Sequence, residues 1–136
     1  MTADYDAMTP AELAAEAARA CGWTLRHLYE DVYVWENGSG NDFSCHAVEQ
    51  WNPDQDANHA EEFLNHFLAA EQKQGRWWNC TAETVVEQRS GVQMYVRKVT
   101  LSRDMGQPGQ VYMAKAETMA RALTIVVLQA HEGVGG

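Results

Sequence analysis

The stretch Thr118–Ala130, with the sequence TMARALTIVVLQA, is apolar on almost every side when it is wound as a helix. The side chains responsible are Leu123, Ile125, Val126, Val127 and Leu128. A surface helix carries one apolar stripe, whereas a helix that is apolar all round is buried. We therefore predict a helix over residues 118–130 that is the most buried element of the chain.

The segments that precede this helix have the pattern of β-structure. Residues 76–101 predict two strands joined by a tight turn at Ser90-Gly91. Along the second strand the side chains of Val92, Met94 and Val96 alternate with those of Gln93, Tyr95 and Arg97. Residues 103–109 predict another turn, and residues 110–115 predict a short third strand.

Two amphipathic helices are predicted nearer the N-terminus. Thr9-Pro10-Ala11-Glu12 has the form of a capping box with proline at the first helical position, and Gly22 ends this helix. Asn52-Pro53-Asp54-Gln55-Asp56 opens the second helix with cap residues, and Gly75 ends it. The second helix has an apolar face made of Ala60, Phe63, Leu64, Phe67 and Leu68.

Between these two helices the sequence predicts a β-hairpin. Residues 23–36 are rich in β-prone side chains, with Val32 and Val34 on one side of the strand and Tyr33 and Trp35 on the other. Residues 37–42 have the composition of a turn, and residues 43–51 predict the returning strand.

This inventory predicts an α+β fold in which an antiparallel sheet of about four to five strands is layered with three helices, in the manner of an α/β/α sandwich. The sheet is antiparallel because the turns between strands are too short for parallel crossovers. A chain of 136 residues has the length of one domain. We expect a single α+β domain over residues 9–131, with flexible ends at residues 1–8 and 132–136.

The net charge limits the classes of partner that the chain can bind, and the cysteines indicate the redox conditions in which it works. A formal net charge of -9, from 19 acidic and 10 basic residues, disfavours direct binding to nucleic acid or to an anionic membrane. The same charge suits a partner protein with a basic surface, and it also suits a solvated surface that only keeps the chain soluble.

Cys21, Cys45 and Cys80 lack the spacing of a disulfide framework or a zinc site and are expected to be free thiols. No secretory signal and no apolar run of about 18 residues is present, so we expect a cytoplasmic protein.

Three segments resemble the phage ABA sandwich domain family of small phage and prophage proteins. They are the helix end Cys21-Gly22-Trp23, the helix start Trp51–Asp56 and the strand-to-helix run Ala114–Leu123, so the resemblance spans about residues 9–131. It implies a helix, sheet, helix layering and a protein that acts inside a bacterial host cell. It implies no catalytic residues and no cofactor.

Candidate metal ligands lie on the second predicted helix. His59, Glu62 and His66 form one stripe, but the two histidines lie about 10 Å apart along the helix axis, too far for one zinc ion with bonds of ~2.1 Å. A solvated helix face is therefore the favoured interpretation. The carboxylates of Asp54, Asp56, Glu61 and Glu62 are compatible with a divalent cation, although helix capping accounts for Asp54 and Asp56.

Candidates for nucleophilic or phosphate chemistry are weaker. Cys45 and His46 are adjacent in a predicted strand and point to opposite faces, so a buried and inert Cys45 is favoured over a thiolate and base pair. Gly38-Ser39-Gly40 lacks the lysine and the helix that follow a phosphate-binding loop.

An aromatic and basic group supplies the candidate binding residues, which are Arg76, Trp77, Trp78, Tyr95 and Arg97. Adjacent tryptophans in a strand cannot face the same layer, so exposure of one of Trp77 and Trp78 is one interpretation. An exposed indole beside arginines fits a planar, nucleotide-like ligand or an anchor for a protein partner. The favoured interpretation places both tryptophans in a two-sided core under the helices.

Three functions fit these observations. The leading hypothesis is a non-enzymatic phage or prophage accessory protein that binds a host macromolecule, inhibition of a host defence system being one such role. The alternative is a protein that binds or sequesters a small, nucleotide-like molecule. The third is a hydrolase built on Cys45 or on His59 and His66. A homodimer is compatible with each of them, because edge strands need cover.

Overall fold

The structure is a computed structural model that describes residues 4–30, 32–36, 45–47, 51–103 and 110–135. The elements, in chain order, are the 3-10 helix η1 (Tyr5–Ala7), α1 (Pro10–Ala20), β1 (Thr24–Tyr29), β2 (Val32–Glu36), β3 (Cys45–Ala47), α2 (Ala57–Lys73), β4 (Asn79–Arg89), β5 (Val92–Arg103), β6 (Gln110–Ala116) and α3 (Met119–Gly135). Every pairing between these strands is antiparallel, which confirms the predicted α+β class. In the part of the chain that is described, no helix is long and apolar enough to cross a membrane.

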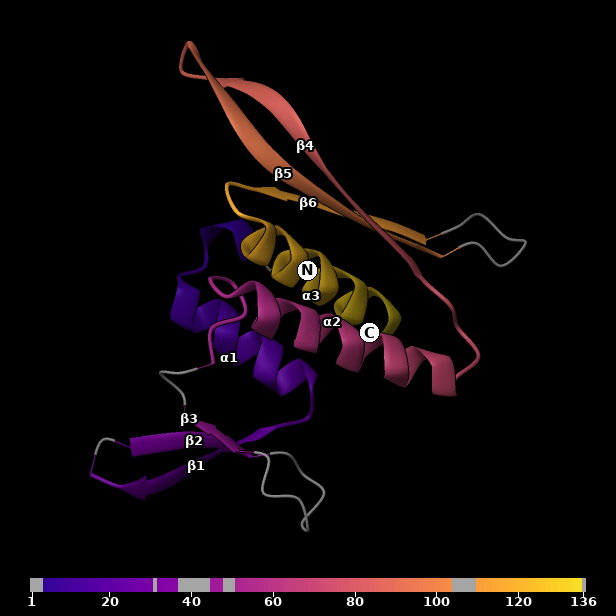
Figure 1. Cartoon of the computed structure of the whole chain (residues 1–136). Coiled ribbons are helices and arrows are strands. Elements are labelled where there is room, and N and C mark those ends of the chain that lie inside the picture. Colours follow the sequence, from indigo (N-terminus) through magenta and orange to yellow (C-terminus); the bar gives the residue numbers. More distant parts are fainter. Residues whose placement is uncertain (1–3, 31, 37–44, 48–50, 104–109, 136) are drawn as a thin grey trace.

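The strands form two sheets rather than the single sheet that the sequence predicted. One sheet has the order β1-β2-β3 and the other has the order β4-β5-β6. Figure 1 shows the β4–β6 sheet lying over α3 and the β1–β3 sheet on the other side of the helical layer, beyond α1. The α+β class thus holds, but the strands are divided between two sheets instead of forming one sheet of four to five strands. The physical cause of this division lies in α3, which is apolar all round and takes cover from β5 and β6 on one side and from α1 and α2 on the other.

The central position of α3 is the feature that the sequence predicted best. Residues 122–128 of this helix are buried without interruption, and Thr124 is the one polar side chain among them. The Thr124 Oγ1 atom donates to the carbonyl oxygen of Pro53 at 2.7 Å and lies 2.8 Å from that of Ala120, so its burial leaves no unsatisfied hydroxyl.

The two segments predicted to be flexible ends carry regular structure where they are described. Residues 5–7 form η1, and α3 continues to Gly135. The Tyr5 side chain is buried, and its hydroxyl donates to a carboxylate oxygen of Glu132 at 2.6 Å. This contact explains the difference, because a buried aromatic ring with a satisfied hydroxyl orders both segments at once.

The predicted start of α1 and the glycines predicted to end α1 and α2 are confirmed by backbone geometry. The Thr9 hydroxyl accepts from the Glu12 amide and the Glu12 carboxylate accepts from the Thr9 amide, as a capping box requires. Gly22 and Gly75, which follow α1 and α2, adopt φ angles of 79° and 75°. These left-handed conformations are the ones in which glycine ends a helix.

The predicted strand over residues 23–36 is two strands, β1 and β2, which form a hairpin. Glu30 lies between them with a φ of 46°, so the chain reverses inside a segment that is β-prone throughout. The predicted pairing of the second part with a returning strand is confirmed by the β2–β3 ladder. The turn over residues 37–42 lies outside the described residues.

A long hairpin of β4 and β5 projects from the body of the molecule (Figure 1). Its turn has the predicted residues Ser90 and Gly91, whose φ angles of 53° and 78° are those of a type I′ turn. The strand β6 pairs with β5 only over Arg97–Arg103. The residues beyond that pairing, Val85–Val96, are called the ribbon below.

Candidate functional site

Three of the five predicted binding residues lie in the connection between α2 and β4. Arg76, Trp77 and Trp78 precede β4, so the prediction that the two tryptophans belong to a strand is wrong. Trp77 is 62% exposed, whereas Trp78 is partly buried against the core. The favoured interpretation, a two-sided core that covers both tryptophans, is therefore wrong for Trp77.

Arg76 and Trp78 are held by a buried carboxylate that the sequence prediction missed. Glu71 is 5% exposed and accepts from Arg76 Nε at 2.9 Å, from Arg76 Nη2 at 2.7 Å and from Trp78 Nε1 at 2.9 Å. These hydrogen bonds lower the pKa of Glu71, and the bonding to Arg76 is the largest cause. A signal was present, because Glu71 continues the apolar stripe of Phe63 and Phe67 at a spacing of four residues. A lone carboxylate on such a stripe requires a partner.

The other two predicted binding residues lie elsewhere on the β4–β5 hairpin. Asn79, next to the tryptophans, pairs with Ser102, whereas Tyr95 pairs with Val86. Tyr95 and Ser102 are seven positions apart, which corresponds to about 23 Å of strand. Tyr95 is 76% exposed on the ribbon, so the structure does not bring it to Trp77.

Arg97, the remaining predicted binding residue, also has a local partner. Its Nη1 atom donates to Thr84 Oγ1 at 2.6 Å across the β4–β5 ladder. The five residues therefore do not form one site.

The predicted metal ligands on α2 are not assembled either. The His59 Nδ1 atom accepts from the backbone amide of Asn52 at 3.0 Å, and its ring stacks on Trp51. His59 therefore fixes the loop that precedes α2. Across the described residues, no group of three histidine, cysteine or carboxylate side chains is placed to hold a metal ion.

The described thiols are not activated as nucleophiles. Burial, followed by the negative charge of Glu62, raises the pKa of Cys21 to about 12. Desolvation also raises the pKa of Cys80. A nucleophilic cysteine requires a lowered pKa. The side chains of Cys45 and His46, and the segment Gly38-Ser39-Gly40, lie outside the described residues.

Asp54 belongs to a buried polar network at the N-terminal end of α3, rather than to a helix cap. The cap of α2 is Asp56 alone, which accepts from the amides of Asn58 and His59. Asp54 is 3% exposed, and its Oδ2 atom lies 3.7 Å from Arg121 Nη1. Among the described residues its Oδ1 atom has no hydrogen-bond partner. Burial raises the pKa of Asp54, and the charge of Arg121 acts against that change.

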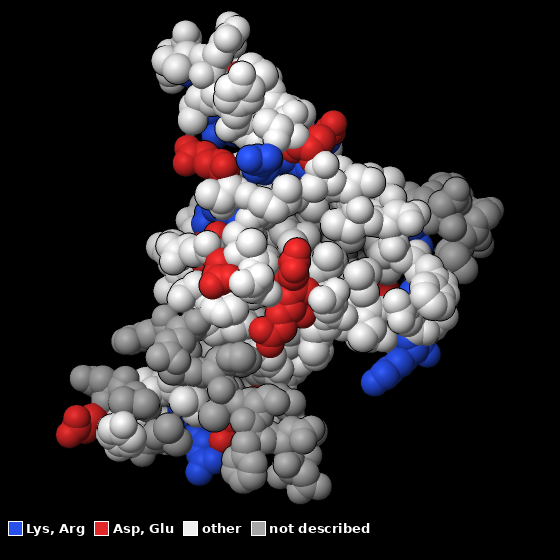
Figure 2. Space-filling model, viewed as in Figure 1, with Lys and Arg blue, Asp and Glu red and all other residues white. Residues whose placement is uncertain are grey.

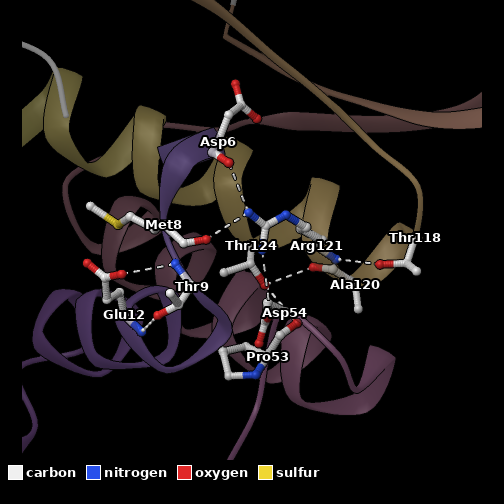
Figure 3. A network of polar contacts seen from close by, with 10 residues as sticks. All are labelled: Asp6, Met8, Thr9, Glu12, Pro53, Asp54, Thr118, Ala120, Arg121 and Thr124. Atoms are coloured by element: carbon white, nitrogen blue, oxygen red, sulfur yellow. Dashed lines mark hydrogen bonds and ion pairs between the residues drawn. The ribbon is translucent and has the colours of Figure 1, made fainter. Parts of the chain in front are cut away.

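Arg121 connects this network to the start of the chain (Figure 3). Its Nη2 atom donates to the carbonyl oxygens of Asp6 and Met8 at 3.2 and 2.9 Å. Its backbone amide donates to Thr118 Oγ1 at 3.2 Å, which makes Thr118 the cap of α3. The arginine thus holds η1, the start of α2 and the start of α3 together.

A hollow of about 670 Å³ opens beside this network, at the free edge of β6. The basic side chains in its lining are Arg89, Lys115 and Arg121, and the acidic ones are Asp6, Asp54 and Glu117. Arg89 and Lys115 each contact Glu87, at 3.1 and 3.0 Å. The hollow is a concave site of mixed charge, of a size that suits a small ligand.

Charge is strongly segregated along the chain. Residues 1–72 hold 14 of the 19 acidic side chains and 2 of the 10 basic ones, a formal charge of -12, whereas residues 73–136 hold the other 5 acidic and 8 basic ones, a formal charge of +3. We call these the acidic half and the basic half. The acidic half supplies α1, α2 and the β1–β3 sheet, and the basic half supplies α3 and the β4–β6 sheet. Figure 2 shows acidic groups over the middle of the helical layer and a basic group at its right-hand end, whereas acidic and basic groups lie side by side across the projecting hairpin.

A comparison of the chain with protein-family models, with curated proteins and with solved structures finds no match in any of the three. The candidate sites are therefore defined by the geometry and the charges of this chain alone.

Proposed function

We propose that this chain is a non-enzymatic accessory protein of a phage or prophage, and that its acidic half binds a host protein with a basic surface. Inhibition of a host defence system is the role that such binding serves. The segregation of charge is the observation that carries this proposal, and the resemblance of the helix boundaries to phage proteins supports the source.

Segregated charge favours such binding more than the net charge alone does. A formal charge of -12 confined to residues 1–72 gives a stronger local potential than -9 spread over the whole surface. On α2 the carboxylates of Glu61 and Glu62 are exposed, as is that of Glu12 on α1. Opposite potentials on two proteins accelerate their encounter, and added salt screens the attraction.

The test compares two variants with opposite expectations. The chain is used to capture proteins from a bacterial host extract, the captured protein is purified, and its binding rates are measured at two or more salt concentrations. Replacing Glu61 and Glu62 by lysine should slow association roughly tenfold and flatten its dependence on salt. The control Glu117→Lys changes charge in the basic half and should leave association nearly unchanged. Equal effects of the two changes, or association that salt does not slow, would reject the acidic half as the binding surface.

The hollow beside Arg121 favours a second candidate function, the binding of a small, nucleotide-like anion. Its support is the convergence of Arg89, Lys115 and Arg121 near the N-terminal end of α3, where the helix dipole favours negative charge. Calorimetric titration with nucleoside mono- and diphosphates tests it. Binding that Lys115→Ala weakens at least tenfold would support the hollow as the site, and a titration without heat or thermal stabilisation would exclude these ligands.

A further inference from the structure

The strand β4 is a long open edge. Nine of its eleven residues are exposed, and Val85 and Glu87 are the two that are half-buried. Of the residues that commonly protect an edge from pairing with another chain, proline and lysine are absent from β4, and its charged side chains are Glu83, Glu87 and Arg89. Within the described part of the chain, β5 is the strand that pairs with β4, and its other edge is uncovered.

The ribbon also exposes apolar side chains in register. Val86 is 56% exposed and Tyr95 is 76% exposed, and the two are cross-strand partners on one face. Val92, beside the turn, is 60% exposed. A two-stranded hairpin is only marginally stable in water unless a further strand or a helix covers it. The ribbon therefore has both a free edge and an apolar face that lack cover.

The turn fixes which backbone groups face the open edge. A two-residue type I′ turn closes on a hydrogen-bonded pair, which here is Arg89 with Val92. Backbone groups alternate in direction along a strand. The amides and carbonyls of Thr84, Val86 and Gln88 therefore point away from β5, toward the open edge.

We propose that two copies of this chain dimerise through β4, with Val86 on the two-fold axis, so that their β4–β6 sheets join into one six-stranded sheet. Thr84 then lies opposite Gln88 of the second copy, and each of these pairs has its backbone groups directed at the other strand. The apolar side chains of Tyr95 and Val86 continue across the axis into those of the second copy.

Charge complementarity favours this register over the one with Thr84 on the axis, and the length of paired strand favours it over the one with Gln88 on the axis. With Gln88 there, Glu87 lies opposite Arg89 of the second copy, but only residues 87–89 of β4 are paired, against residues 83–89 with Val86 on the axis. With Val86 on the axis, Glu83 lies opposite Arg89 of the second copy, on the same face of the sheet, and symmetry repeats the pair. With Thr84 on the axis, Glu83 lies opposite Val85 and no pair of opposite charges forms. The ribbon lies in the basic half of the chain, so the strongly acidic half does not oppose the contact.

The first test measures the mass of the full chain by sedimentation equilibrium across the micromolar range. Val86→Pro removes an amide that points to the open edge, so the β4–β5 ladder remains and the dimer is lost. The matched control is Met113→Pro, which removes an outward amide at the opposite edge of the same sheet and leaves the dimer intact. A monomeric wild-type chain, or a dimer that is lost in Met113→Pro instead, overturns the proposal.

Two further variants test the register without a proline. In a Cys80→Ser background, Val86→Cys places two thiols across the axis with Cα atoms about 5.5 Å apart, within the range of a disulfide. Thr84→Cys places them about 14 Å apart and does not cross-link. Glu83→Arg should raise the dissociation constant of the dimer roughly tenfold, and adding Arg89→Glu should restore it. Preferential cross-linking through Thr84→Cys, or no restoration by the double change, overturns the register.

Discussion

Replacing Glu71 by glutamine removes the buried charge that holds the connection between α2 and β4. The carboxylate accepts three hydrogen bonds, two from Arg76 and one from Trp78, at 2.7–2.9 Å. Two of these donors share Oε1, so a glutamine oxygen at that position retains them. The amide nitrogen then faces Arg76 Nη2, a donor, and that bond is lost.

The expected cost follows from the charge on the bonds and from the exposure of the partner. A hydrogen bond to a charged group contributes about 1.5–3 kcal/mol, and one between neutral groups about 0.5–1.5 kcal/mol. The Arg76 side chain is 33% exposed and recovers part of its hydration in the variant. We therefore expect Glu71→Gln to lower the free energy of unfolding by about 1.5–3 kcal/mol at pH 7.

Urea unfolding followed by tryptophan fluorescence measures this difference, with unchanged m-values as the check that the two chains unfold alike.

The fold lowers the pKa of Glu71 from its ordinary value of 4.5. Its stabilisation is therefore complete above that value and is lost as the pH falls through the lower, folded pKa. The deficit of the variant should shrink on acidification. The exposed Glu61→Gln on the same helix is the control and should change stability by less than about 0.5 kcal/mol. A Glu71→Gln deficit no larger than the control's, or one that does not vary with pH, would refute the role given to this carboxylate.

Three other changes test the fold. Thr9→Ala removes the cap of α1 and should lower the free energy of unfolding by about 1 kcal/mol in the same assay. Asp54→Asn should become more stable relative to the wild type as the pH rises from 4 to 7, because the raised pKa of the buried Asp54 makes its ionised form destabilising. A difference in the free energy of unfolding that stays constant over this pH range would contradict this. Gly133→Ala should cost about 1–3 kcal/mol although alanine favours a helix, because its Cβ would meet the Tyr112 hydroxyl, and a thermal melt at or above the wild-type temperature would show that the ring can move aside.

Features that depend on neighbouring residues could be predicted from the sequence, and features that depend on distant ones could not. The capping box of Thr9 and the burial of α3 are local patterns, and both are confirmed. The division of the strands into two sheets is not local, because alternation along a strand does not say which strands meet. Asp54 shows the same limit, since its partner Arg121 lies 67 residues along the chain and proximity in sequence favoured a cap instead.

The candidate sites divide in the same way. The exposure of Trp77 does not follow from strand alternation, because Trp77 and Trp78 precede β4. The separation of Tyr95 from the start of β4 depends on the register of the hairpin, which places Ser102, about 23 Å from Tyr95 along β5, opposite Asn79. The segregation of charge can be counted directly from the sequence, but the net charge of the whole chain does not reveal it. Neither the hollow beside Arg121 nor the open edge of β4 has a sequence pattern, because each is formed by the way separate elements pack.

The position of α3 sets the order in which the protein can fold during its synthesis. The ribosome makes this helix after every element that packs against it, and at about 5–20 residues per second it follows α1 by roughly 5–20 s. During that interval the apolar side chains of Phe63 and Phe67 on α2, and of Val99 and Leu101 on β5, lack the surface that later buries them. The nascent chain thus spends seconds as a substrate for chaperones, and the emergence of α3, rather than the formation of any earlier helix, is the event that completes the core.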